Sequence, residues 1–310
     1  MPYESALHTA AEPVEFLSRE QWGQRQQQHQ QEVDELTAAH LKRRSRGEKH
    51  PIMDFLFDYY PVKPGKLRTW HPGIGVVVQD AAEFLQRRDY MAVDAPQTAG
   101  SNPAVVCATV NVQGFVQRRG DSLRFIRHLL SRTATNPAHF DCFGLHEWAM
   151  VYRTTTPRHD LPLRLGPAGT NEVVDSHVLR CTHYDAFRFF TPAARPLNAR
   201  ELSRDDQPRC DQRGCLHATM DLYKWATKLG PLVPGEVWLE TFRLARDVRQ
   251  LDMAASPYDC SEYGLEPVCI ETAEGKAEYV ARQRQFALRA EPLREKLIRI
   301  IDAAVIDAAA

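Results

Sequence analysis

The sequence lacks long apolar runs. No stretch approaches the roughly 18 residues that a membrane-spanning helix needs, and the opening "MPYESALHTAAEPVEF" has neither the basic nor the apolar region of a secretion signal. The seven cysteines are odd in number and scattered through a chain too long to need disulfide bonds. We therefore expect a cytoplasmic protein with reduced thiols and no membrane partner.

A strong excess of one charge is also missing. The formal net charge is −1, so the molecule as a whole has no field that attracts polyanions, and a nucleic-acid surface would have to be a local patch. The 43% hydrophobic and 25% charged residues are typical of a globular protein and argue against disorder.

Segments with strand-like alternation are few. The best candidates are "VVCATV" at 105–110 and "EVVDSHVLRC" at 172–181. Helical patterns dominate, most clearly from 236 to 251, where apolar residues recur at helical spacing. Further helices are expected over 18–47, 121–132, 140–153, 214–230, 273–290 and 292–308. We expect a mainly α protein with minor β, in which residues 1–17 form a flexible arm and 18–310 a single large helical domain.

One helical pattern, "FDCFGLHEWAMVYR" at 140–153, is apolar around almost its whole circumference. His146 and Glu147 lie about 100° apart on such a helix, so both cannot reach water without exposing its apolar residues. A buried carboxylate is costly unless it is paired, and such groups are candidates for general acid–base catalysis. The alternative is an ion-paired Glu147 and a His146 bound to a carbonyl. We expect Glu147 to be buried beside a cavity shared with His183 or Asp185.

The segment "CTHYDAFRFFTP" contains those two residues. In a strand, Cys181, His183 and Asp185 would share one face, which suits acid–base or metal chemistry. In a helix, Thr182 and Asp185 would form a capping box instead.

A third candidate site is "RCDQRGCLH", where Cys210, Cys215 and His217 could ligate zinc, although the usual C-x2-C pair is missing. His217 also shares a polar helical face with Asp221, Lys224 and Lys228, as in a solvated ladder of ion pairs.

Two clusters of basic residues could contact phosphates. The alternative is that both are solvated surface. The first comprises Lys42, Arg43, Arg44, Arg46 and Lys49, and the second Arg118, Arg119, Arg124, Arg127 and Arg132.

The segment from His71 to Gly75, followed by Asp94, resembles the helix-hairpin-helix element of base-excision glycosylases. In that family a Pro-Gly-x-Gly hairpin binds phosphate and a catalytic Asp follows. Here Val76, Val77 and Val78 favour a strand after the hairpin, where the family has a helix.

Several segments resemble bacterial proteins carried under the name 3-methyladenine DNA glycosylase. They are "RGEKHPIMDFLFDYY", "LRTWHPGIGVV", "CFGLHEWAMVYR", "RCTHYDAFRFFTPAA", "CLHATMDLYKW" and "LDMAASPYD". The resemblance implies a DNA partner, no cofactor, and hydrolysis of the N-glycosidic bond of alkylated purines. Glu147 or Asp185 would be the carboxylate that activates water or stabilises the oxocarbenium ion, with His146 and His183 nearby. Trp148, Tyr184 or Trp70 would stack on the flipped base.

Two other functions fit the same residues. A metal-dependent enzyme acting on a small molecule could bind a divalent ion with His146, Glu147, His183 and Asp185. A nucleic-acid-binding protein without catalysis could instead use Arg43, Arg44, Arg46 and Lys49 together with Arg118 and Arg119.

Overall fold

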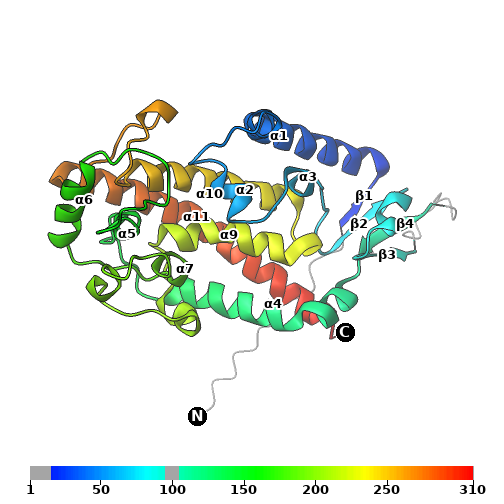
Figure 1. Cartoon of the computed structure of the whole chain (residues 1–310). Helices are drawn as coiled ribbons and strands as arrows, with labels where there is room; N and C mark the ends of the chain where they lie inside the picture. The colour runs from blue at the N-terminus through cyan, green and yellow to red at the C-terminus, as the bar shows by residue number, and fades with distance from the viewer. Residues whose placement is uncertain (1–14, 95–104, 310) are drawn as a thin grey trace, which may run out of the picture.

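The computed structural model describes residues 15–94 and 105–309, and it confirms a mainly α fold with minor β. Five long helices make up most of it. They are α1 (Arg19–Ser45), α4 (Val112–Thr135), α9 (Leu216–Leu229), α10 (Gly235–Ala254) and α11 (Ala273–Asp307). Helix α9 is central and packs against α4, α10 and α11, while α1 lies on the far side of α10 (Figure 1).

A small sheet lies at one end of the molecule (Figure 1). It contains β1 (Glu15–Leu17), β2 (Val76–Gln79), β3 (Tyr90–Val93) and β4 (Cys107–Val110), in the order β1-β2-β4-β3. β1 pairs in parallel with β2 (Phe16 opposite Val77), and the other pairings are antiparallel. The three valines thus continue as a strand and not as a hairpin helix. Residues 15–17, which we expected in a flexible arm, are part of the sheet, and residues 1–14 lie outside the described chain.

The predicted start of the first helix is confirmed, whereas the predicted division of the C-terminal segment into two helices is wrong. Ser18 and Gln21 form the expected capping box at the start of α1. The C-terminal pattern, expected as two helices, is one helix that continues through Pro292. A proline inside a helix costs about 3 kcal/mol, but Ala290, Leu293 and Leu297 on both sides of it are buried in the core. This packing offsets the lost hydrogen bond.

Short helices connect the long ones. They are α2 (Phe55–Asp58), α3 (Pro64–Leu67), α5 (Leu145–Ala149), α6 (Gly166–Asp175), α7 (Tyr184–Phe187) and α8 (Gln207–Cys210). Five 3-10 turns are also present among the described residues: η1 (Ala82–Gln86), η2 (Arg195–Leu197), η3 (Arg204–Asp206), η4 (Gly230–Leu232) and η5 (Ser261–Tyr263). Helices α5, α6 and α7 lie at the end opposite the sheet (Figure 1).

Two predicted elements near α5, a long helix and a strand, are wrong. The expected helix over 140–153 shrinks to α5, because Phe143, Gly144 and Arg153 have positive φ angles (47°, 70° and 51°) that a continuous helix does not allow. The strand expected at 172–181 does not form: residues 172–175 are the last turn of α6, and the rest is turn and loop with one isolated bridge between Leu179 and Asn198. Val173 and Val174, neighbours in sequence, are both buried, which a strand with one solvated face would not permit.

Within 15–94 and 105–309, no helix combines the length and hydrophobicity that a membrane span requires.

Candidate functional site

Charged and polar side chains from four helices meet inside the end of the molecule that contains α5. They are His146 and Glu147 (α5), His183 and Asp185 (at α7), His217, Asp221 and Lys224 (α9), and Arg249 and Asp252 (α10). The polar face of α9 is therefore not a solvated ladder as we had considered. His217 is 8% exposed and Asp221 1% exposed, because α9 is covered by its neighbouring helices.

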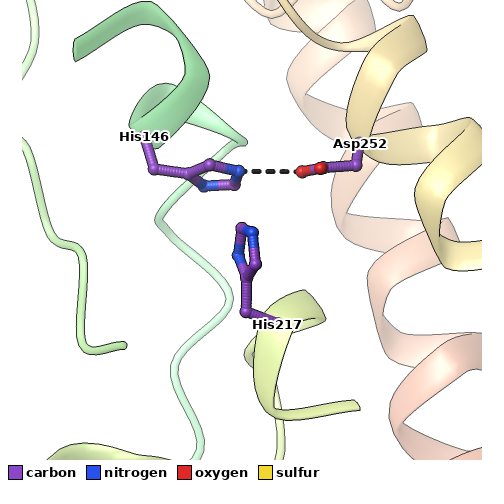
Figure 2. Close-up of side chains that lie close together, drawn as sticks. All are labelled: His146, His217 and Asp252. Carbon is purple, nitrogen blue, oxygen red and sulfur yellow. Dashed lines mark hydrogen bonds and ion pairs between the residues drawn. The ribbon is translucent and has the colours of Figure 1, made fainter. Parts of the chain in front are cut away.

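The first group of this cluster is His146, His217 and Asp252 (Figure 2). His146 Nε2 lies 2.8 Å from Asp252 Oδ1, so the ring donates a hydrogen bond to the carboxylate. His217 approaches from α9, with its ring edge toward His146 and the two ring centroids 4.4 Å apart. One nitrogen or oxygen from each residue lies within 4.8 Å of the others. Two histidines and a carboxylate at such distances are a donor set suited to a divalent transition metal.

His217 makes no hydrogen bond to another residue that the structure describes, and its ring keeps a small exposed surface. Burial lowers its pKa well below 6.5, and the neighbouring His146 lowers it further. The ring is therefore neutral at pH 7 and keeps a nitrogen lone pair beside the His146–Asp252 pair. This exposed surface leaves the imidazole open to a water molecule or to a metal ion.

Arg249 joins this group to Glu147. Its Nη1 lies 2.7 Å from Asp252 Oδ2 and 3.1 Å from Glu147 Oε1, and the arginine is 1% exposed. Burial alone would raise the pKa of Asp252, but His146, His217 and Arg249 outweigh it and lower that pKa. Two carboxylates and one guanidinium leave a net charge of −1. A bound cation would balance this charge, and an uncompensated buried charge costs several kcal/mol.

The second group, His183, Asp185 and Asp221, is already balanced by cations. Lys224 Nζ lies 2.8 Å from Asp185 Oδ2 and 2.9 Å from Asp221 Oδ2. His183 Nδ1 lies 2.9 Å from Asp211 Oδ1. Burial would lower the pKa of His183, but Asp211 and Asp221 outweigh burial and raise it. The ammonium of Lys224 thus lies where a metal ion would have to bind.

A cavity of about 10 Å³ adjoins both groups and has Glu147, Asp185, His217 and Arg249 in its wall. This volume holds about one water molecule. Aromatic rings of Phe55, Tyr59 and Phe189 complete part of the wall. Glu147 is 4% exposed, so the prediction that it is buried beside a cavity shared with Asp185 is confirmed.

The structure therefore regroups the residues predicted as a site. His146 and His183 belong to different groups, and His217 lies between them, with its ring 5.5 Å from His183 and nearly parallel to it. The proposed set of His146, Glu147, His183 and Asp185 is not one metal-binding group among the described residues. The Cys210–Cys215–His217 zinc set does not form within them either.

The three predicted stacking residues lie in different environments. Trp70 is 0% exposed and its indole donates to Glu236 Oε1 at 3.0 Å, so it is a core residue. Trp148 is 0% exposed and its indole donates to the carbonyl of Ala255, so it is a core residue that offers no face to a base in this conformation. Tyr184 is half-buried at the start of α7.

Sequence reasoning missed Tyr60, Arg249 and Asp252. Tyr60 Oη donates to Asp221 Oδ1 at 3.0 Å. Arg249 and Asp252 follow Val248 and Leu251 in the apolar pattern of α10, and all four are buried. A charged pair at i, i+3 inside a buried pattern could have indicated the site.

The first basic cluster lies at the C-terminal end of α1 and just beyond it, the second lies on α4, and these two helices are on opposite sides of the molecule (Figure 1). Several of their charges are already paired. Arg43 pairs with Asp54, Arg46 with Glu48, and Arg118 with Asp89. Arg44, Lys49 and Arg119 are exposed and have no ion-pair partner within 15–94 and 105–309. The clusters cannot form one continuous surface.

No known protein family matches the chain, and neither a curated protein nor a solved structure is similar to it.

Proposed function

We propose that this protein is a metal-dependent hydrolase whose divalent ion is bound by His146, His217 and Asp252. The observation that carries the proposal is the neutral, unpartnered His217 beside the His146–Asp252 pair. The residual negative charge of the group supports it, since a divalent cation would compensate that charge.

The choice between the two groups follows from their charges. In the second group Lys224 bridges both carboxylates, and a cation there would have to displace a buried ammonium. In the first group Arg249 pairs with Asp252 through Oδ2 and leaves Oδ1 facing the histidines. A metal ion at the first group would take the place of the proton between His146 Nε2 and Asp252 Oδ1, and His217 would supply the third donor atom.

The cavity suggests the reaction class. A divalent ion lowers the pKa of a bound water and polarises a substrate oxygen. Glu147 is in the cavity wall beside His217 and would accept the proton of the attacking water as general base. Arg249 holds the Glu147 carboxylate in place and would stabilise developing negative charge. The cavity has room for the attacking water but not for a substrate, so the cavity would have to open to admit even a small one.

A second candidate is the alkylpurine DNA glycosylase implied by the resemblance. The observation in its favour is that Glu147 and Asp185 share one cavity with the aromatic rings of Tyr59 and Phe189. A carboxylate and aromatic faces are what release of a cationic base requires. A cavity of about 10 Å³ would have to open widely to admit a purine. This widening is why we rank it second.

One experiment separates the two functions. Chromogenic esters, amides and phosphoesters, and alkylated duplex DNA, are each incubated with the protein after loading with Zn²⁺, Mn²⁺ or Fe²⁺ and after chelation. A hydrolase of the proposed kind turns over a small substrate only when loaded. Glu147→Gln should lower that turnover ~10²-fold or more while metal content is kept.

A glycosylase would instead leave abasic sites in alkylated DNA with or without chelator, and far fewer with Glu147→Gln. Turnover of a small substrate that survives chelation, or none with any loaded metal, contradicts the metal-dependent hydrolase. Asp58→Asn, at an exposed carboxylate on α2, is the control and should behave as wild type.

A further inference from the structure

A larger cavity, of about 300 Å³, is lined by residues next to His183 and Asp211 in sequence. Its wall contains Cys181 and Thr182, which precede His183, as well as Cys210 and Gln212, which flank Asp211. Because His183 and Asp211 hydrogen-bond each other, the same two segments build this cavity and the candidate catalytic cluster. Its volume lies at the lower end of the range for small-molecule sites.

The charged part of the wall is mainly cationic. Arg180, Arg200 and Arg209 come from three separate parts of the sequence, and Asp141 is the one acidic residue in the described wall. The arginine and aspartate side chains of the wall therefore sum to a charge of +2. Asp206, which pairs with Arg209 from outside the wall, reduces this to one.

Arg200 has the weakest hydrogen-bond partner of the three arginines. Its Nη1 donates to Cys210 Sγ at 3.3 Å, and it has no carboxylate partner among the described residues. A thiol is a weak acceptor. Burial raises the pKa of the nearby Cys181 thiol to about 12, so that thiol adds no negative charge.

The other two arginines are held by weak surface pairs. Arg180 Nη1 lies 2.9 Å from Asp141 Oδ2, and both side chains are about half exposed. Exposed pairs of this kind contribute about 0–1 kcal/mol, so a multiply charged ligand can displace them. The uncharged part of the wall is fixed by contrast, since Gln212 Oε1 accepts from the backbone N–H groups of His139 and Gly214.

We propose that this cavity, which we call the arginine pocket, binds the phosphate group of a small phosphate monoester. Guanidinium groups bind phosphate in bidentate fashion and keep their charge at all accessible pH values. Converging arginines favour a dianion over a monoanion, which distinguishes a phosphate monoester from a carboxylate. The pocket is separate from the proposed metal group, so the proposal does not depend on the metal.

The test is calorimetric titration of the full-length protein with phenyl phosphate, with benzoate as the carboxylate of similar shape. The expected result is one phenyl phosphate per chain, bound at least tenfold more tightly than benzoate. Arg200→Gln and Arg180→Gln should each weaken phenyl phosphate binding about tenfold or more, since each removes a charge-assisted contact. Both residues are exposed, so the variants should fold.

Arg204→Gln is the matched control, an exposed arginine on η3 outside the pocket wall, and should change the dissociation constant less than about twofold. Three results would overturn the proposal: no saturable binding of phenyl phosphate, equal weakening by Arg204→Gln and Arg200→Gln, or benzoate bound as tightly as phenyl phosphate.

Discussion

The ring of His217 meets the ring of His146 edge-on, at 77° and 4.4 Å between centroids. The first residue begins a helix in the centre of the fold, and the second lies on a five-residue helix 71 positions earlier. The two rings form a group of three possible metal ligands together with Asp252 (Figure 2). The following predictions test the stability, charge and metal binding of this arrangement.

Arg249→Met should cost about 3–5 kcal/mol of unfolding free energy, because it leaves the Glu147 and Asp252 carboxylates buried without their guanidinium partner. Urea denaturation of the variant and of Arg249→Met/Glu147→Gln measures the effect, and the second change should recover part of the loss. Arg68→Met, which breaks an exposed pair with Asp34, is the control and should cost about 1 kcal/mol or less. Equal losses in both single variants would show that the buried network is not structurally important.

Arg294 tests the opposite case, a buried charge without partners. Its side chain is 1% exposed and none of its three guanidinium nitrogens has a hydrogen-bond partner in the described chain. Burial lowers the pKa of Arg294 to about 10. Arg294→Met keeps most of the apolar stem and removes the guanidinium, so it should raise the unfolding free energy by roughly 1–3 kcal/mol. A loss of more than about 1 kcal/mol would instead show that the guanidinium has a favourable partner.

The long helices of the fold could be predicted from the sequence, whereas most contacts of the candidate site could not. The repeat of buried apolar residues along α10 predicted that helix, because burial of one face imposes the helical period. Asp252 lies on the same helix, yet its partner His146 is 106 positions away, and no local pattern encodes such a contact. Glu147 was predicted to be buried because its immediate neighbours are apolar. Arg249, which makes that burial tolerable, comes from another helix and could not be paired with it from the sequence.

His71 should make stability depend on pH. Burial lowers the pKa of His71 to about 3, and Arg87 lowers it further. As the pH falls below about 6.5 the unfolded chain takes up a proton on this residue while the folded chain does not, so stability decreases toward acid pH. His71→Asn should remove about 2 kcal/mol of the loss between pH 7 and pH 5. Urea denaturation of wild type and of His71→Asn at pH 7 and pH 5 measures this loss. An equal loss of unfolding free energy in the two proteins would contradict the lowered pKa of His71.

The basic cluster on α1 is tested by salt dependence. Arg44 and Lys49 are exposed, whereas Arg43 pairs with Asp54 and belongs to the fold. If the cluster contacts phosphates, Arg44→Gln/Lys49→Gln should flatten the slope of log K against log salt for duplex DNA by about 2, since each contact contributes ~0.9. Binding should weaken similarly for all sequences. Unchanged slopes would remove this cluster from a nucleic-acid-binding function.

The most direct test of the metal-dependent hydrolase is the metal content of the purified chain. The protein is stripped with chelator and dialysed against Zn²⁺, Mn²⁺ or Fe²⁺. Elemental mass spectrometry then measures the number of metal ions bound per chain. His40→Asn is the matched control, because His40 is also buried and lies 2.8 Å from a carboxylate, that of Asp54, but belongs to no three-donor group in the described chain. We predict one divalent ion per chain in wild type and His40→Asn, and about tenfold or more weaker binding in His217→Asn and His146→Asn. Wild type that binds no divalent ion, or a His217→Asn variant that binds it as tightly as wild type, would contradict the account.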